Sequence, residues 1–243
     1  MYKFSKLIIS TFLIVIQFAI LNAAEVCNYT VKMLCFPALD LKMKLNNYDK
    51  DNKKLEFFAQ TNNTFDKLYK VENYYQCIYD KQSFRPEFRS KKIDQPGFEQ
   101  VAEAEYENGK AHYSNGKKLD IPRQTYSLLS LLMYLRFQDL DCNNSDNIKI
   151  EVEGTIYAVD LQKTGVDKIE VDNKKIKADV VKIVLTEEIS HQKIFEDSDI
   201  FFNNVVNPKG KRKVWIEKGG QKRILKAKFS LKGVSLVARL KGG

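Results

Sequence analysis

The sequence is poor in the residues that most often carry out catalysis or hold metals. It has 243 residues but only two histidines, four cysteines, five prolines and one tryptophan. No cysteine pair is spaced by two residues, and the cysteines lie too far from His112 and His191 to suggest a zinc site. The serine elbow of hydrolases, the helical zinc motif of metalloproteases and the glycine-rich phosphate loops are missing as well. The sequence therefore predicts no catalytic residue, no metal site and no cofactor.

A hydrolase is the minority hypothesis, and it would require carboxylates or histidines that converge in one pocket. Acidic residues concentrate at Glu187, Glu188, Glu196, Asp197 and Asp199. Paired carboxylates can hydrolyse glycosides or bind calcium, but the ligand order of a calcium-binding loop is not met here. We expect a solvated acidic loop that faces the basic C-terminal strands.

The only long apolar run lies at the N-terminus, within Met1 to Ala24. Lys3 and Lys6 precede the run from Leu7 to Leu21, and small residues follow it, which is the order of parts in a secretory signal. The run of about 15 residues is shorter than the roughly 20 needed to span a bilayer. We expect cleavage near Ala23 or Ala24, export to the periplasm and a mature chain that does not span the membrane. An uncleaved single-pass anchor is the alternative.

Positive charge is concentrated at the C-terminal end. The net charge is +9, and the stretch from Pro208 to Gly243 carries twelve Lys and Arg against one acid, while the first 207 residues carry 28 bases and 30 acids. In an exported protein such a block can meet anionic lipid or an envelope glycan, and export argues against nucleic acid as the partner. We take Lys226, Lys228 and Lys232 as candidate contacts to an anionic surface. The alternative is a solvated strand face that protects a sheet edge.

The four cysteines are Cys27, Cys35, Cys77 and Cys142. An even number in an exported chain permits two disulfides, with three pairings. Cys27 and Cys35 are close enough to lie on one hairpin and form the candidate pair. Buried, unpaired thiols are the alternative.

Alternation of apolar and polar residues dominates the chain after the N-terminal segment and predicts about 11 to 13 short strands. One segment, Tyr126 to Phe137, has helical periodicity and is preceded by Pro122 and Thr125 as a start signal. We expect residues 25–243 to form a single all-β domain, mainly antiparallel, with one packed helix near residues 125–137. A sheet of this size should curl into a β-barrel or half-barrel.

Strand aromatics are the remaining positive signal. A barrel of this strand count either encloses an apolar cavity or is filled by its own side chains. Five aromatic residues are candidates for a cavity lining that would suit an acyl or isoprenoid chain: Tyr74, Tyr79, Phe88, Tyr106 and Trp215.

The order of these segments resembles the exported bacterial family called domain of unknown function 3108. The resemblance is carried by "VENYYQCIYDKQSFRPEFRSKKI", "EAEYENGKAHY", "LDIPRQTYSLLSLLMYLR" and "KRKVWIEKGGQKRILKAKFSLKGVSLVAR". The chain departs from the family at Glu217 to Gly220, where an acidic turn is usual, and at Ile224 and Leu225, where a proline is common. The resemblance implies a β-barrel-like fold in the cell envelope and assigns no activity.

Two functional hypotheses follow from these observations. The first is a non-enzymatic periplasmic or envelope-associated protein that binds a hydrophobic or amphipathic, lipid-like ligand. The second is an envelope structural or interaction protein with a filled core, which docks on a partner protein through its surface. An empty or a packed interior would distinguish them.

Overall fold

The computed structural model describes residues 24–67, 69–138 and 147–242 of the chain. The predicted signal segment, Met1 to Ala24, lies almost wholly outside the described residues, as does Cys142. Among the described residues, no helix has the length and apolar character needed to cross a membrane.

Fifteen strands and three short helices make up the described structure. The strands are β1 (Glu25–Met33), β2 (Phe36–Asn47), β3 (Asn52–Thr61), β4 (Glu72–Asp80), β5 (Pro86–Gln95), β6 (Phe98–Glu107), β7 (Lys110–Tyr113), β8 (Lys118–Asp120), β9 (Thr125–Ser127), β10 (Lys149–Val152), β11 (Thr155–Val171), β12 (Lys174–His191), β13 (Lys211–Glu217), β14 (Ile224–Leu231) and β15 (Val234–Leu240). The helices are α2 (Asn63–Asp66), α3 (Leu128–Phe137) and α4 (Ile200–Val205).

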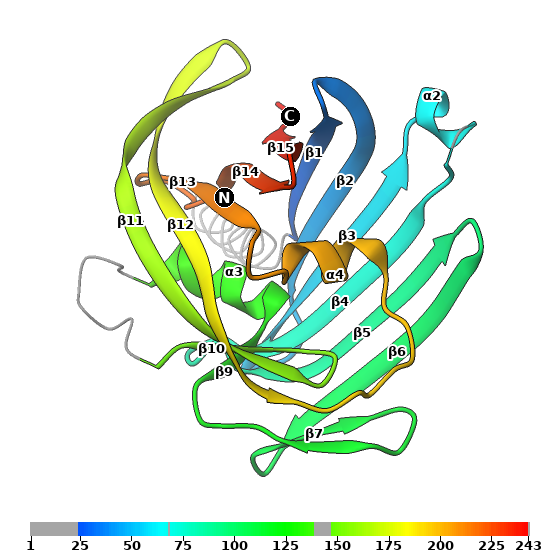
Figure 1. Cartoon of the computed structure of the whole chain (residues 1–243). Coiled ribbons are helices and arrows are strands. Elements are labelled where there is room, and N and C mark those ends of the chain that lie inside the picture. The colour runs from blue at the N-terminus through cyan, green and yellow to red at the C-terminus, as the bar shows by residue number, and fades with distance from the viewer. Residues whose placement is uncertain (1–23, 68, 139–146, 243) are drawn as a thin grey trace, which may run out of the picture.

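All fifteen strands belong to one sheet, in the order β8-β7-β6-β5-β4-β3-β2-β1-β15-β14-β13-β12-β11-β10-β9. Neighbouring strands are antiparallel except β9 and β10, which are parallel. The first and last strands pair with each other, with Tyr29 opposite Leu240. Because β8 and β9 form the two edges, the sheet is not closed. The predicted fold class, a mainly antiparallel curled sheet with a packed helix, is confirmed (Figure 1).

Register shifts in several strand pairs help to curl the sheet. They occur at Val31/Lys32 in β1, at Ile78/Tyr79 in β4 and at Trp215/Ile216 in β13. A β-bulge bends its strand and increases the local twist, so repeated bulges favour a curved sheet over a flat one. In Figure 1 the strands β2 to β6 form one wall, β11 and β12 form the other, and α3 lies between them.

The long strand β11 contrasts with the short strands that the alternating pattern predicts. It runs through 17 residues, with a register shift between Lys163 and Gly165 in its pairing with β12. The polar residues around this shift are an irregularity within one strand. The short edge strands β8 and β9 were not predicted, because three residues are too few to show an alternating pattern.

Helix α3 starts two residues later than its periodicity suggested. Ser127 is its N-cap, and the side chains and backbone N–H groups of Ser127 and Ser130 form a reciprocal capping box. Thr125 and Tyr126 belong to strand β9 instead. The predicted core role is confirmed, since Leu131, Met133 and Leu135 are buried in the main hydrophobic core.

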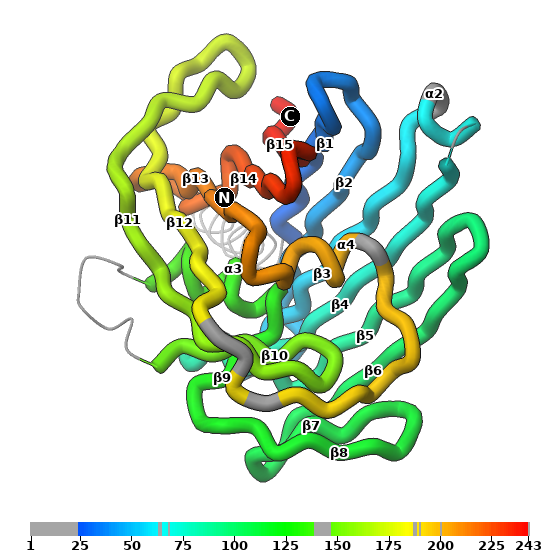
Figure 2. Tube along the Cα trace, viewed as in Figure 1, coloured from blue at the N-terminus to red at the C-terminus, as the bar shows by residue number. Residues whose placement is uncertain are grey.

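A segment from Gln192 to Asn207 crosses the open side of the curved sheet between β12 and β13. Figure 2 shows it passing along β6 and then through α4. The side chain of Asn115 donates to Ile194 O at 2.8 Å, and that of Gln100 donates to Asp197 O at 3.0 Å. We call residues 192–207 the strap.

Candidate functional site

A buried carboxylate on β10 connects strands from both ends of the sheet. Glu151 is fully buried, and its oxygens accept hydrogen bonds from Tyr106 Oη at 2.5 Å, Tyr113 Oη at 2.7 Å and Gly154 N at 2.8 Å. Arg89 Nη2 lies 3.1 Å from Glu151 Oε1 and completes an ion pair. A buried charge is stable when it is paired and its lone pairs are occupied, and Glu151 meets both conditions.

The position of these donors follows from the sheet order. Arg89, Tyr106 and Tyr113 lie on β5, β6 and β7 near one edge, whereas Glu151 lies on β10, one strand from the other edge. Burial raises the pKa of Tyr106 and of Tyr113 well above the usual tyrosine range. Both hydroxyls therefore stay protonated and donate hydrogen bonds to Glu151. Side chains thus join the two ends of a sheet whose backbone is not closed.

A second group of buried ion pairs connects the strap to strand β5. Lys91 on β5 and Asp199 of the strap are both buried, with Nζ 3.0 Å from Oδ2, and Lys91 also forms an ion pair with Glu153. Asp199 is the N-cap of α4, where its Oδ1 accepts from Phe202 N at 2.9 Å. Asp199 was predicted to lie in a solvated acidic loop, and this prediction was wrong for Asp199, because Lys91 neutralises it inside the fold. We call Arg89, Lys91, Glu151, Glu153 and Asp199 the ionic cluster.

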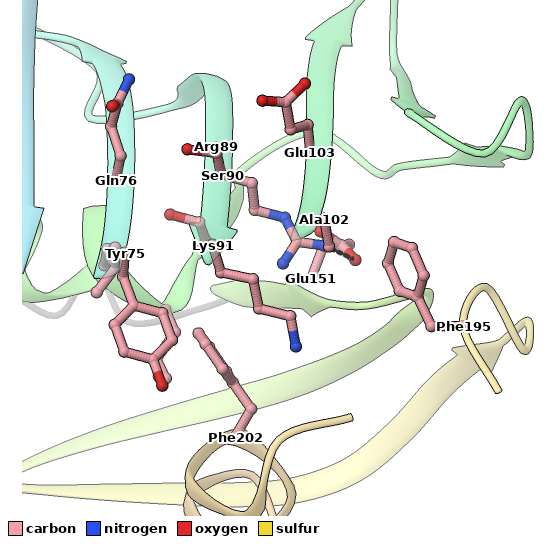
Figure 3. A pocket seen from close by; sticks show the side chains of 13 residues that line it. Tyr75, Gln76, Arg89, Ser90, Lys91, Ala102, Glu103, Glu151, Phe195 and Phe202 are labelled. Atoms are coloured by element: carbon pink, nitrogen blue, oxygen red, sulfur yellow. Dashed lines mark hydrogen bonds and ion pairs between the residues drawn. The ribbon is translucent and has the colours of Figure 1, made fainter. Parts of the chain in front are cut away.

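A cavity of about 20 Å³ lies beside the ionic cluster, between Arg89, Lys91, Phe195 and Phe202 (Figure 3). This volume is close to the room that one water molecule needs. Carboxylates do converge here, as a hydrolase would require, but the cavity is far too small for a sugar or an ester between them. Each carboxylate is also held by a cation. The arrangement suits a structural network better than acid–base catalysis.

Other chemistry has little support in the part of the chain that the structure describes. It contains no group of three or more His, Cys, Asp or Glu side chains placed to hold a metal ion. His112 Nε2 lies 3.9 Å from Glu107, and His191 Nδ1 is 2.8 Å from the Thr155 hydroxyl on another part of the sheet. The two histidines therefore do not meet.

An open groove of about 690 Å³ lies at the margin of the main core, where the β4–β5 turn and the β8–β9 turn approach α3. Its aromatic wall consists of Phe84, Tyr126 and Tyr134. The rings of Tyr126 and Tyr134 are 5.0 Å apart, and Phe84 meets Tyr134 edge to face at 6.1 Å. Burial raises the pKa of Tyr126 to about 12. We call this feature the α3 groove.

Two arginines stand at the α3 groove. Arg85 follows Phe84 in the β4–β5 turn, and Arg123 precedes Gln124 in the β8–β9 turn; both side chains are exposed. Neither arginine forms an ion pair with a carboxylate among the described residues. The α3 groove thus combines an aromatic wall with two cations that are available to a ligand.

The five candidate cavity aromatics do not surround one space. Tyr74 and Phe88 lie on the opposite sheet face from Tyr75 and Arg89, because side chains alternate along a strand. Tyr79 is buried against Phe84, and Tyr106 belongs to the network of Glu151. Trp215 lies under the ammonium of Lys226, 4.1 Å from its ring centre, and donates to Asp167 at 3.0 Å. None of the five lines the 20 Å³ cavity or the α3 groove.

The candidate basic contacts lie close together. Lys226 pairs across strands with Arg239, Lys228 pairs with both Lys213 and Val237, and Lys232 occupies the β14–β15 turn. This register places Lys226 and Lys228 on one face of β14 and Leu225, Ala227 and Phe229 on the other. The lysines are half-buried or exposed, as a surface contact requires.

The candidate disulfide is not formed. Cys27 is buried in β1 opposite Met43, and Cys35 is exposed in the β1–β2 turn; both are free thiols. Eight positions of extended chain separate them, a distance of about 25 Å, whereas a disulfide needs Cα atoms within about 7 Å. Cys77 is also free, so buried unpaired thiols describe Cys27 and Cys77 correctly.

The fold and the site define a class: a curled, unclosed, mainly antiparallel β protein whose two sheet ends are joined by buried ion pairs. The chain belongs to the family described as protein of unknown function (DUF3108), whose model matches residues 28–240. No curated protein matches this chain.

Two solved structures are similar to the chain. A β-barrel-like protein of domain of unknown function DUF1849 from Brucella abortus superposes with a TM-score of 0.52 at 9% identity, covering 90% of this chain and 95% of that chain. The lipoprotein LppX from Mycobacterium tuberculosis superposes with a TM-score of only 0.30 at 10% identity, covering 88% of this chain and 84% of that one. The first similarity shows a shared fold, and the second is too weak to support an argument.

Proposed function

We propose that this protein is a non-enzymatic, exported binding protein of the cell envelope, which takes an amphipathic ligand with an acidic head into the α3 groove. The observation that carries the proposal is the pairing of an aromatic wall with Arg85 and Arg123 in a space of about 690 Å³. Ligand sites of roughly 300 to 1,000 Å³ that combine apolar walls with a few polar groups are the usual size for small molecules.

The chemistry of the α3 groove selects the ligand class. Tyr134 is half-buried and Phe84 and Tyr126 are 5% and 6% exposed, so the wall presents mainly Tyr134 and the ring edges beside it to an apolar body, and a guanidinium binds a carboxylate or phosphate through charge-assisted hydrogen bonds. A fatty acid or another acyl compound with one acidic group satisfies both features. Export is supported by the signal-like order of residues in Met1 to Ala24.

The small space beside the ionic cluster supports a binding role rather than a reaction there. The ionic cluster holds its carboxylates against Arg89 and Lys91, and the adjacent space is about 20 Å³. A substrate therefore finds no room beside these groups. Binding in the α3 groove requires no change in the ionic cluster.

Fluorescence titration with cis-parinaric acid, an acyl chain with a carboxylate, tests the proposal. The wild-type protein should bind it saturably, and the variant Arg85→Ala/Arg123→Ala should bind at least tenfold more weakly, since a hydrogen bond to a charged group contributes about 1.5–3 kcal/mol. Hexadecanol, which lacks the charge, should compete equally with both proteins. The charge-matched control Lys50→Ala/Lys118→Ala should bind like the wild type. Equal affinity in the arginine variant would refute the assignment.

A further inference from the structure

The β1–β2 turn and the β14–β15 turn lie side by side because β1 pairs with β15. Leu34 N donates to Ser235 O at 3.4 Å, and the hydroxyls of Ser230 and Ser235 are 3.0 Å apart. Three large apolar residues at these turns are exposed: Leu34 by 57%, Phe36 by 66% and Val234 by 45%. We call these three residues the apolar tip.

The backbone of the β1–β2 turn is unusual for its sequence. Leu34 and Cys35 have φ angles of +47° and +77°, the left-handed region that a two-residue hairpin turn requires. Asn-Gly is the favoured pair in such a turn, and the chain uses it at Asn108 and Gly109. A bulky apolar residue held in this conformation and exposed to water costs stability, and strained positions of this kind cluster at functional sites.

A cluster of positive charge lies on the other face of the strands that carry the apolar tip, because Phe36 pairs with Met33 and Val234 with Leu231, out of step with Lys32 and Lys228. The strand register places Lys182, Lys213, Lys228 and Lys32 in one row across the sheet, interrupted only by Val237, and Lys226 and Arg239 in the next row. Residues paired in this way point to the same face. We call these six side chains the basic face. Lys32 and Lys228 are only two to four residues from the turns, or about 7 to 13 Å along the strand.

Like charges directly opposite each other on neighbouring strands are unfavourable in isolation. Lys213 opposite Lys228 and Lys226 opposite Arg239 are two such pairs, and Asp167, which accepts from Trp215 beneath Lys226, offsets part of the repulsion in the second pair. An anionic partner would relieve this repulsion. Exposed apolar residues at a tip, with Lys32 within a Debye length of about 8 Å and further lysines beyond it, match the profile of an anionic bilayer, with headgroups outside and acyl chains beneath.

We propose that the apolar tip and the basic face form a membrane-docking surface, in which Leu34, Phe36 and Val234 enter the interface of an anionic phospholipid bilayer and the basic face binds its headgroups. The proposal goes beyond ligand binding and does not depend on the α3 groove, which is built from other turns. It also gives the protein an orientation, since the β1–β2 and β14–β15 turns then point towards the bilayer.

Co-sedimentation with vesicles tests the proposal on protein recovered from the exported fraction. Vesicles of phosphatidylcholine and phosphatidylglycerol in a 7:3 ratio should bind the wild type, and pure phosphatidylcholine should bind it at least tenfold more weakly. Lys32→Gln/Lys213→Gln/Lys228→Gln should lose about a hundredfold on the anionic vesicles, at about fivefold per charge. The control Lys50→Gln/Lys118→Gln/Lys175→Gln should bind like the wild type. All variants have the same N-terminal segment, so any vesicle binding by that segment is equal in all of them. Differences in binding between variants therefore report on the docking surface.

A separate variant tests the contribution of the apolar tip to vesicle binding. Leu34→Asn/Phe36→Thr should bind anionic vesicles at least tenfold more weakly while its melting temperature stays equal or rises, because asparagine suits the left-handed turn. Val101 is also 66% exposed and Tyr48 is 58% exposed, so Val101→Thr/Tyr48→Asn is the matched control and should bind normally. Unchanged binding by the tip variant would overturn the proposal, and so would retention by an acidic protein or by heparin without vesicle binding.

Cys35 provides a direct readout of insertion. It is exposed in the β1–β2 turn between Leu34 and Phe36, whereas Cys27 and Cys77 are buried. With Cys142→Ser in place, a nitrobenzoxadiazole label on Cys35 should shift its emission to the blue and brighten on anionic vesicles. A label that stays in water while the protein sediments would contradict insertion of the tip.

Discussion

A fully buried carboxylate such as Glu151 is stable only where donors surround it. Glu151 has four, from Arg89, Tyr106, Tyr113 and the backbone of Gly154. Removing one member of a buried ion pair leaves the other charge uncompensated, and this typically costs about 3–5 kcal/mol. Among single residues, Glu151 and Arg89 should therefore contribute most to the stability of the folded chain.

Glu151→Gln should therefore lower the free energy of unfolding by about 3 kcal/mol at pH 7. The amide can still accept a hydrogen bond but cannot neutralise Arg89. Urea unfolding measures the change, and the exposed control Glu99→Gln on β6 should stay within about 0.5 kcal/mol of the wild type. A loss below about 1 kcal/mol in Glu151→Gln would mean that Arg89 is not isolated inside the fold.

Buried tyrosines predict a loss of stability in alkali. Burial raises the pKa of Tyr126 to about 12, and the pKa values of Tyr75, Tyr106 and Tyr113 are raised further. Above the ordinary tyrosine pKa of about 10 the unfolded chain loses these protons while the folded chain keeps them, so stability falls as pH rises. The contribution of Tyr126 is complete below pH 10 and is lost as pH rises through about 12, and that of the other three tyrosines is lost at still higher pH.

Urea unfolding at pH 9 and pH 11 measures this effect, with tyrosinate absorbance at 295 nm as a second readout. The unfolding midpoint should be lower at pH 11, and Tyr126→Phe should reduce the difference by the share that Tyr126 contributes. A midpoint that is the same at both pH values would show that these hydroxyls ionise as readily in the folded chain as in the unfolded one.

At the scale of elements, α3 depends on a buried cap. Ser127 Oγ accepts from Ser130 N at 3.0 Å, and Ser130 Oγ accepts from Ser127 N at 3.0 Å. Ser127→Ala should lower the free energy of unfolding by about 1–2 kcal/mol, because an N-terminal N–H loses its acceptor. Chemical denaturation measures it, with Ser90→Ala, outside any helix cap, as the control. Equal losses in the two variants would show that the cap contributes nothing specific.

Most elements were predictable because their apolar pattern is local. The alternation in β14 and the helical spacing of Leu128 to Leu135 are visible within ten residues, and both were placed correctly apart from their ends. The three-residue strands β8 and β9 and the six-residue α4 are too short for such a pattern. The full length of β11 could not be predicted, because the polar residues at its register shift look like a turn in the sequence.

The ionic cluster could not be found in this way, because it depends on contacts between distant parts of the chain. Arg89 and Glu151 are 62 residues apart, and Lys91 and Asp199 are 108 apart. In sequence Arg89 and Lys91 look like ordinary polar residues of an alternating strand. One signal was available: Glu151 stands between Ile150 and Val152 in a short apolar strand, and a charge there needs a buried partner.

For the whole molecule, the ionic cluster explains how an unclosed sheet holds its shape. The backbone leaves β8 and β9 as edges, while Glu151 joins one end of the sheet to the other and Lys91 fastens the strap across the open side. The space beside the ionic cluster is about 20 Å³. The proposed ligand binding and membrane docking both lie away from this cluster, at the α3 groove and at the apolar tip.

Native mass spectrometry of the protein recovered from its exported fraction can show whether the α3 groove holds a ligand. We expect a bound acidic amphiphile on the wild type, released by organic extraction, and its absence from Arg85→Ala/Arg123→Ala that folds with the wild-type melting temperature. A wild-type protein that carries no such molecule and binds no added acyl carboxylate, or an arginine variant that retains the same molecule, would contradict ligand binding in the α3 groove.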